Sequence, residues 1–155
     1  MIVNYSDEEF IKSKKSIFLA GPTPRSEDIV SWRKEAIRIL KENGFDGVVY
    51  VPEYKSMKPR SDYEDQVLWE REGLTNATAI VFWVPRKTPG MEGYTTNVEF
   101  GYYMHTNKII YGRPNDAEKT KYLDWLYEYD YGYKPFDDLE RMLKLAIKKV
   151  NGSVR

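Results

Sequence analysis

Four short apolar runs divide the chain, and a segment with helical spacing follows each of them. The runs cover 16–20, 47–51, 78–84 and 108–112. They are apolar at most positions rather than at every second one, which is typical of strands buried on both faces of a sheet. Glycine or proline ends each run, as expected where a strand gives way to a loop. The pattern therefore predicts four strands.

Between and after these runs, apolar positions recur at i, i+3 or i+4, the spacing of a helix with one buried face. Helices are expected over 29–40, 62–76, 95–105, 116–127 and 136–150. Strands that alternate with helices indicate a parallel sheet covered on both faces. We expect an α/β fold, a flavodoxin-like or Rossmann-like three-layer sandwich with a mainly parallel sheet of four or five strands. A length of 155 residues suits one domain, residues 1–155.

Aromatic side chains crowd the stretch 122–136, which is the one unusual tract of the chain. Tyr127, Tyr129, Tyr131 and Tyr133 occupy every second position, the spacing of an extended segment. Aromatic clusters of this kind most often pack against a core or form a subunit interface. A lid over the substrate is the alternative.

The composition narrows the chemistry that is available. The chain has no cysteine and one histidine, His105, which excludes disulfides, thiol chemistry and metal sites built from several of these residues. We expect no metal and no cofactor. Basic and acidic side chains number 24 each, and a chain without basic excess is not typical of a nucleic-acid binder.

Two features of the sequence bear on where the protein works. The N-terminal residues lack the basic and apolar regions of a signal peptide. The longest apolar run, 79–84, is too short to span a membrane. We therefore expect a cytoplasmic protein with small-molecule partners, without nucleic-acid or membrane partners.

In an open parallel sheet, ligands bind beyond the carboxyl ends of the strands. Four segments lie there: 21–25, 52–54, 85–96 and 112–115. Neither a G-x-G-x-x-G fingerprint nor a phosphate-binding P-loop is present among them. Gly21, Pro22 and Thr23 form a tight turn whose backbone N–H groups could meet a phosphate or a ribose hydroxyl.

Two glutamates are the candidate catalytic groups. Glu99 follows Thr96 by three residues, which matches a helix capping box. It also lies among apolar and aromatic neighbours near the expected site, where a partly desolvated carboxylate could act as nucleophile or base. Glu70 and Glu72 lie two apart on one helix and cannot both face inward, so a solvated helix face is the plain alternative for them. Gly101 suggests the close approach of another backbone.

Three blocks of sequence, in order, resemble the nucleoside 2-deoxyribosyltransferase family. They are 17–22, 70–77 and 97–102, the last reading N-V-E-F-G-Y. The resemblance spans about residues 16–112 and implies transfer of deoxyribose between nucleobases by double displacement. By the E-x-G-Y motif, Glu99 would be the nucleophile that attacks the anomeric carbon. Glu70, where the family more often has aspartate, would contact or protonate the leaving base.

Two positions depart from the family pattern. Phe18 replaces a tyrosine that would orient the nucleophile, so Tyr94 or Tyr102 is the candidate for that role. Gly93 replaces an acidic residue that binds the base. Asn97 could bond to ribose or base, or could cap a helix. Family members are commonly oligomeric, with neighbouring chains helping to build the site, so a homo-oligomer is expected.

Two other functions compete with transfer of the sugar between bases. Related enzymes hydrolyse nucleosides or nucleoside monophosphates with the same carboxylates. Arg25 could then bind a 5′-phosphate, although an ordinary surface residue is the interpretation we favour. A non-catalytic module that binds or senses a nucleotide would keep the fold without the chemistry.

Overall fold

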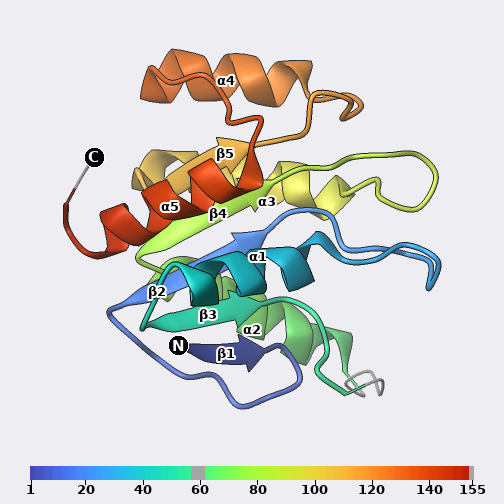
Figure 1. The fold of residues 1–155 in the computed structure, drawn as a ribbon. Coiled ribbons are helices and arrows are strands. Elements are labelled where there is room, and N and C mark those ends of the chain that lie inside the picture. The colour runs from blue at the N-terminus through green and yellow to red at the C-terminus, as the bar shows by residue number, and fades with distance from the viewer. Residues whose placement is uncertain (57–61, 154–155) are drawn as a thin grey trace.

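Five parallel strands form the sheet found in the described part of the chain, in the order β1-β3-β2-β4-β5 (Figure 1). The computed structural model describes residues 1–56 and 62–153. The strands are β1 (Ile2–Tyr5), β2 (Ser16–Ala20), β3 (Val48–Val51), β4 (Ala79–Trp83) and β5 (Ile109–Gly112). Every residue of β2, β3, β4 and β5 is buried, as their apolar runs predict. The order changes direction at β2, which places the expected ligand site near the end of that strand.

Helices cover both faces of this sheet, which gives the predicted three layers (Figure 1). The helices are α1 (Trp32–Glu42), α2 (Tyr63–Asn76), α3 (Tyr94–Tyr103), α4 (Lys121–Tyr131) and α5 (Leu139–Val150). Helices α1 and α5 pack on one face, and α2, α3 and α4 pack on the other. The α/β sandwich with a mainly parallel sheet is therefore confirmed.

Side chains along β2 show how one strand serves both layers. Ile17 and Leu19 belong to the core under α1 and α5, whereas Phe18 and Ala20 belong to the core under α2 and α3. Successive side chains of a strand point to opposite faces, so an unbroken apolar run fills two cores at once. None of the helices in the described ranges is long and apolar enough to cross a membrane.

Strand β1 and several helix ends differ from what the sequence pattern predicts. β1 is an edge strand of four residues whose register pairs Ile2 with Val48. Its alternation is interrupted by a buried polar residue, Asn4, which donates to the Glu9 carbonyl oxygen and accepts from the Ile11 N–H. Capping side chains decide two helix starts: Ser31 accepts a hydrogen bond from the Arg33 N–H and begins α1, and Asp138 begins α5 in the same way.

The expected extended segment among the tyrosines is wrong, because Tyr127, Tyr129 and Tyr131 lie on α4. Residues four apart share a helix face. Tyr127 and Tyr131 stack on the inner side with ring centroids 5.1 Å apart, and Trp125 and Tyr129 stack on the outer side at 4.9 Å. Aromatic residues that alternate in the sequence therefore lie on two different faces of α4.

Candidate active site

A cavity of about 450 Å³ opens at the carboxyl end of β2, between α2 and α3. Its walls come from the loop after β2 (Ala20–Thr23 and Arg25), from Arg33 of α1, from Pro52 after β3, and from facing sides of α2 and α3. This is the edge at which an open parallel sheet binds ligands. The volume lies within the range of small-molecule sites, roughly 300–1,000 Å³.

Two carboxyl groups enter this cavity from opposite helices, Glu70 from α2 and Glu99 from α3. Burial, and then the nearby charge of Glu70, raise the pKa of Glu99 to about 8, although Arg33 acts in the opposite direction. Burial also raises the pKa of Glu70, while a hydrogen bond from Gln66 and the charge of Arg33 oppose that rise. Near neutral pH the unliganded protein therefore keeps Glu99 mostly protonated.

The capping-box interpretation of Glu99 is wrong. Helix α3 begins at Tyr94 and its N-cap is Gly93, which has φ 64° and no side chain to offer. Thr96 lies buried within the first turn and does not cap the helix. Glu99 therefore forms no capping hydrogen bond with the backbone at the start of α3, and its side chain lines the cavity instead.

The solvated-face interpretation holds for Glu72 but not for Glu70. Glu70 lines the cavity and is partly buried, whereas Glu72 is exposed. The Tyr54 hydroxyl donates to Gln66 Oε1, and Gln66 Nε2 donates to Glu70 Oε1 at 3.2 Å. This chain of bonds fixes the orientation of the Gln66 amide and holds Glu70 on the α2 wall.

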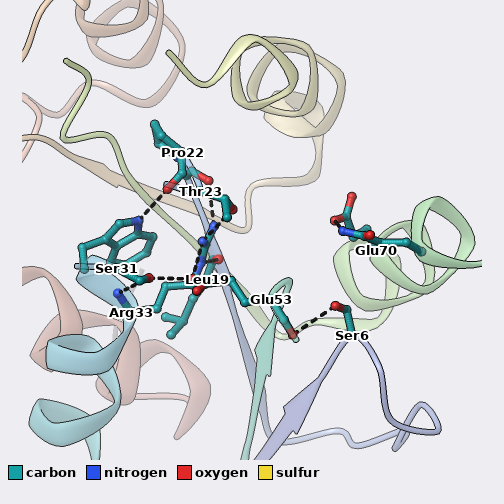
Figure 2. A network of polar contacts seen from close by, with 11 residues as sticks. Ser6, Leu19, Pro22, Thr23, Ser31, Arg33, Glu53 and Glu70 are labelled. Carbon is teal, nitrogen blue, oxygen red and sulfur yellow. Dashed lines mark hydrogen bonds and ion pairs between the residues drawn. The ribbon is translucent and has the colours of Figure 1, made fainter. Parts of the chain in front are cut away.

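Arg33 organises the loop that forms the other wall (Figure 2). Its guanidinium is 2% exposed and donates to the carbonyl oxygens of Leu19 at 2.8 Å and Gly21 at 2.7 Å. It also donates to Thr23 Oγ1 at 2.9 Å and to Glu53 Oε2 at 2.7 Å. A buried charge needs an opposite charge and satisfied hydrogen bonds, and this set supplies both. The network fixes the shape of the turn at Gly21–Thr23, with Glu70 on the facing helix (Figure 2).

Gly21 is required in this turn for two reasons. Its φ is +139°, a conformation that L side chains rarely adopt. A Cβ at this position would lie 2.1 Å from the Trp83 carbonyl oxygen. The loop therefore passes directly over the end of β4. Gly101 differs, because a Cβ there would meet nothing within 4 Å, so the expected close approach of another backbone is wrong.

The structure brings most, but not all, of the expected binding residues to the cavity. Gly21, Pro22, Thr23, Arg25 and Tyr102 line it. The cavity wall does not include Asn97 or Tyr94. Asn97 Oδ1 accepts a hydrogen bond from Arg86 Nη2, and Tyr94 is 80% exposed. Both precede Glu99 by spacings that turn them away from its side of the helix.

Tyr102 and Tyr103 differ sharply although they are neighbours. Tyr102 is 54% exposed, and its hydroxyl accepts a hydrogen bond from Arg71 Nη2 at 3.3 Å. The Arg71 guanidinium also lies over its ring, 5.1 Å from the centroid. Tyr103 is 5% exposed and lines the cavity.

Four residues of the site were not predicted from the sequence: Arg33, Glu53, Gln66 and Tyr103. One signal was available, since Arg33 occupies an apolar-face position of its helix, next to Trp32 and three before Ala36. A charge on the buried face of a helix implies a buried partner. Glu53 lies in one of the segments expected at the ligand edge, but its pairing with Arg33 depends on the chain path.

Across residues 1–56 and 62–153, no group of three or more histidine, aspartate or glutamate side chains could hold a metal ion. The cavity presents two carboxylic acids, three arginines and tyrosine hydroxyls. Such a set can protonate a leaving group, form an ester with an electrophilic carbon and bind oxygen-rich ligands.

Comparisons with known proteins found a family model and a solved structure that match this chain. The family model described as "Nucleoside 2-deoxyribosyltransferase like" matches residues 14–117, a range that includes both glutamates and the Gly21 turn. Among solved structures, the chain is similar to one titled "Crystal structure of conserved protein from Enterococcus faecalis V583". The TM-score is 0.52 at 15% identity, over 90% of this chain and 99% of that one, which shows a shared fold. No curated protein matches the chain.

Proposed function

Because this chain belongs to the nucleoside 2-deoxyribosyltransferase-like family, we propose that it cleaves the N-glycosidic bond of a nucleoside or deoxynucleoside and transfers the sugar to another base. One observation carries this proposal: α2 and α3 bring Glu70 and Glu99 into the same cavity. Cleavage of a glycosidic bond between two carboxyl groups is an established strategy for an oxocarbenium-like transition state.

The reaction has two displacements. The ionised Glu99 carboxylate attacks the anomeric carbon, a C–O bond forms, and the C–N bond to the base breaks with its electron pair leaving on the base. Glu70, in its acid form, gives its proton to the departing nitrogen. A nitrogen of the incoming base then attacks the anomeric carbon, the ester bond to Glu99 breaks, and Glu70 takes the proton released by the new base.

The electrostatic environment of Glu70 and Glu99 supports the roles of acid and nucleophile that we propose for them. Burial raises the pKa of both groups, and the charge of Glu70 raises the pKa of Glu99 further. The productive state has the charge on Glu99 and the proton on Glu70. A developing positive charge on the sugar favours that state, because it lies against Glu99.

Hydrolysis is the second candidate, with water in place of the acceptor base. Arg25 supports a nucleotide substrate for such a reaction, since it is an exposed guanidinium on the cavity wall. A 5′-phosphate would find there a charge-assisted hydrogen-bond donor.

Transfer and hydrolysis are separated by incubating a deoxynucleoside with and without a second free base. New nucleoside that forms only with the second base indicates transfer, and free base released without it indicates hydrolysis. We expect Glu99→Ala to abolish either activity and the mass increase of one deoxyribosyl unit on the intact protein. Glu72→Ala is the matched control, because this neighbouring acidic residue of α2 is exposed and outside the cavity. Unchanged activity in Glu99→Ala would contradict both candidates.

We also propose that the chain acts as one cytoplasmic domain within a homo-oligomer. Exposed aromatic side chains on α4, among them Tyr122, Trp125 and Tyr129 at 72%, 56% and 73% exposure, support a covered surface. Light scattering on a sizing column tests it, and a monomer at all concentrations would contradict it.

A further inference from the structure

The Tyr103 hydroxyl is buried in the cavity wall and has no hydrogen-bond partner within residues 1–56 and 62–153. Tyr103 is 5% exposed, and water does not reach its oxygen. Nearly all buried polar groups in folded proteins are hydrogen-bonded, so an unpaired hydroxyl calls for an explanation. Its place on the wall of the cavity suggests that its partner is formed during function.

Helix geometry points to that partner. Tyr103 follows Glu99 by four residues, so the two side chains lie on the same face of α3. A long side chain on a helix leans toward the helix N-terminus and covers the preceding turn. The Tyr103 ring therefore leans over the turn that carries Glu99, and both side chains line the same cavity.

We propose that Tyr103 is a positioning residue, whose hydroxyl donates a hydrogen bond to the Glu99 carboxylate whenever that carboxylate is ionised. This inference rests on the proposed function, in which Glu99 is the nucleophile. The bond holds the attacking oxygen toward the anomeric carbon. It also favours the charged form of Glu99 over the protonated one.

Arg33 acts on the charge of Glu99, but its hydrogen bonds go to other groups. Glu70 faces Glu99 from α2 and disfavours its charge, while Arg33 faces it from α1 and favours it. Arg33 directs its hydrogen bonds to Leu19, Gly21, Thr23 and Glu53 instead.

Two other polar side chains of this wall, Gln66 and Arg71, are also engaged elsewhere. Gln66 donates to Glu70, and Arg71 donates to the Tyr102 hydroxyl. Among the buried side-chain donors on the described wall of the cavity, the Tyr103 hydroxyl is the one without a hydrogen-bond partner.

The test is Tyr103→Phe, which removes the oxygen and leaves the ring to fill the same space. A hydrogen bond to a charged group corresponds to roughly 10- to 100-fold in an equilibrium or a rate. We expect kcat for base exchange to fall by that factor at pH 7 with little change in KM. The acid limb of the pH–rate profile should move up by about one pH unit.

A second measurement needs no substrate. Glutamate carrying ¹³C at the side-chain carboxyl reports the Glu99 pKa directly, with Glu99→Gln identifying its signal. We expect Tyr103→Phe to raise that pKa by about one unit. In the wild-type protein, the ¹³C signal of the Tyr103 ring carbon that bears the hydroxyl should titrate together with Glu99, a result that holds even if the variant folds poorly.

Tyr131→Phe is the matched control. It also removes a partly buried hydroxyl, which donates to the Met104 carbonyl oxygen at 2.8 Å and lies outside the cavity. It should leave the Glu99 pKa and kcat unchanged, even if it lowers the melting temperature. An unchanged Glu99 pKa in Tyr103→Phe, with no joint titration in the wild type, would overturn the Tyr103 proposal.

Failure of the proposed function looks different from failure of this inference. A wild-type protein that neither exchanges nor releases bases would contradict the catalytic proposal. The NMR titration would still decide whether Tyr103 bonds to Glu99. Normal wild-type activity with no effect of Tyr103→Phe on kcat or pKa would contradict the inference alone.

Discussion

Replacing Arg33 with methionine should lower the free energy of unfolding by about 3–5 kcal/mol, the usual cost of removing one partner from a buried ion pair. The Arg33 side chain is 2% exposed and Glu53 is 22% exposed, so water replaces little of what is lost. The variant leaves the Glu53 carboxylate without its cation and the Leu19 and Gly21 carbonyl oxygens without their donor. Methionine fills much of the space, so the effect is mainly electrostatic.

The matched double variant separates that cost from packing. Glu53→Gln combined with Arg33→Met removes both charges and should recover a large part of the loss, because no uncompensated charge then stays buried. Arg38→Met is the control on the same helix, since Arg38 forms exposed pairs with Glu35 and Glu42. Such surface pairs contribute little, so its unfolding midpoint should stay close to that of the wild type.

Urea unfolding followed by circular dichroism measures these differences. At this chain length the expected loss corresponds to a melting temperature lower by roughly 6–20 °C. A protein of ordinary stability, about 5–15 kcal/mol, would still fold at room temperature. A loss below about 1 kcal/mol for Arg33→Met would refute the reasoning. The reasoning would also be refuted if the double variant lost more unfolding free energy than the two single variants lose in total.

Two further predictions concern Glu99 and the glycines. Glu99 has a pKa near 8 in the folded protein, above its value in the unfolded chain, so the folded state holds more protons and stability should fall as pH rises from about 5 to 8. Glu99→Gln should flatten that part of a urea-midpoint profile, and an unchanged slope would show that Glu99 is not desolvated. Gly101→Ala should raise stability by about 0.5–1 kcal/mol, because the site is helical and open, whereas Gly21→Ala should lower the melting temperature by clashing with the Trp83 carbonyl oxygen. The opposite order in a thermal-melt comparison would refute the description of these two backbones.

The sequence alone was sufficient for the architecture and for the family. Four continuous apolar runs predicted β2, β3, β4 and β5, and helical spacing between them predicted the helices. The residues of the three family blocks lie within the matched range 14–117. These features are local, because the periodicity of burial and the spacing of a motif are both written along the chain. The edge strand β1 escaped notice because four residues with a polar member carry too weak a pattern.

The site depended more on the tertiary structure. The spacing of Thr96 and Glu99 fitted both a helix cap and a catalytic carboxylate, and only the start of α3 at Tyr94 separated them. The same is true of Tyr102 and Tyr103, neighbours of equal chemistry that both line the cavity but differ in exposure, 54% against 5%. Helix spacing predicts which residues share a face, but it does not predict whether that face contacts solvent, the core or a cavity.

The sequence by itself determined strands β2 to β5 and the helices, which acids are available for chemistry and which family the chain belongs to. The tertiary structure decided that Arg33 lies buried against Glu53, that Glu70 and Glu99 share one cavity, and that Tyr103 has an unpaired hydroxyl there. The physical reason is that desolvation and charge coupling depend on distances between segments far apart in the chain. A pKa near 8 for Glu99 arises from burial and from a carboxylate on another helix.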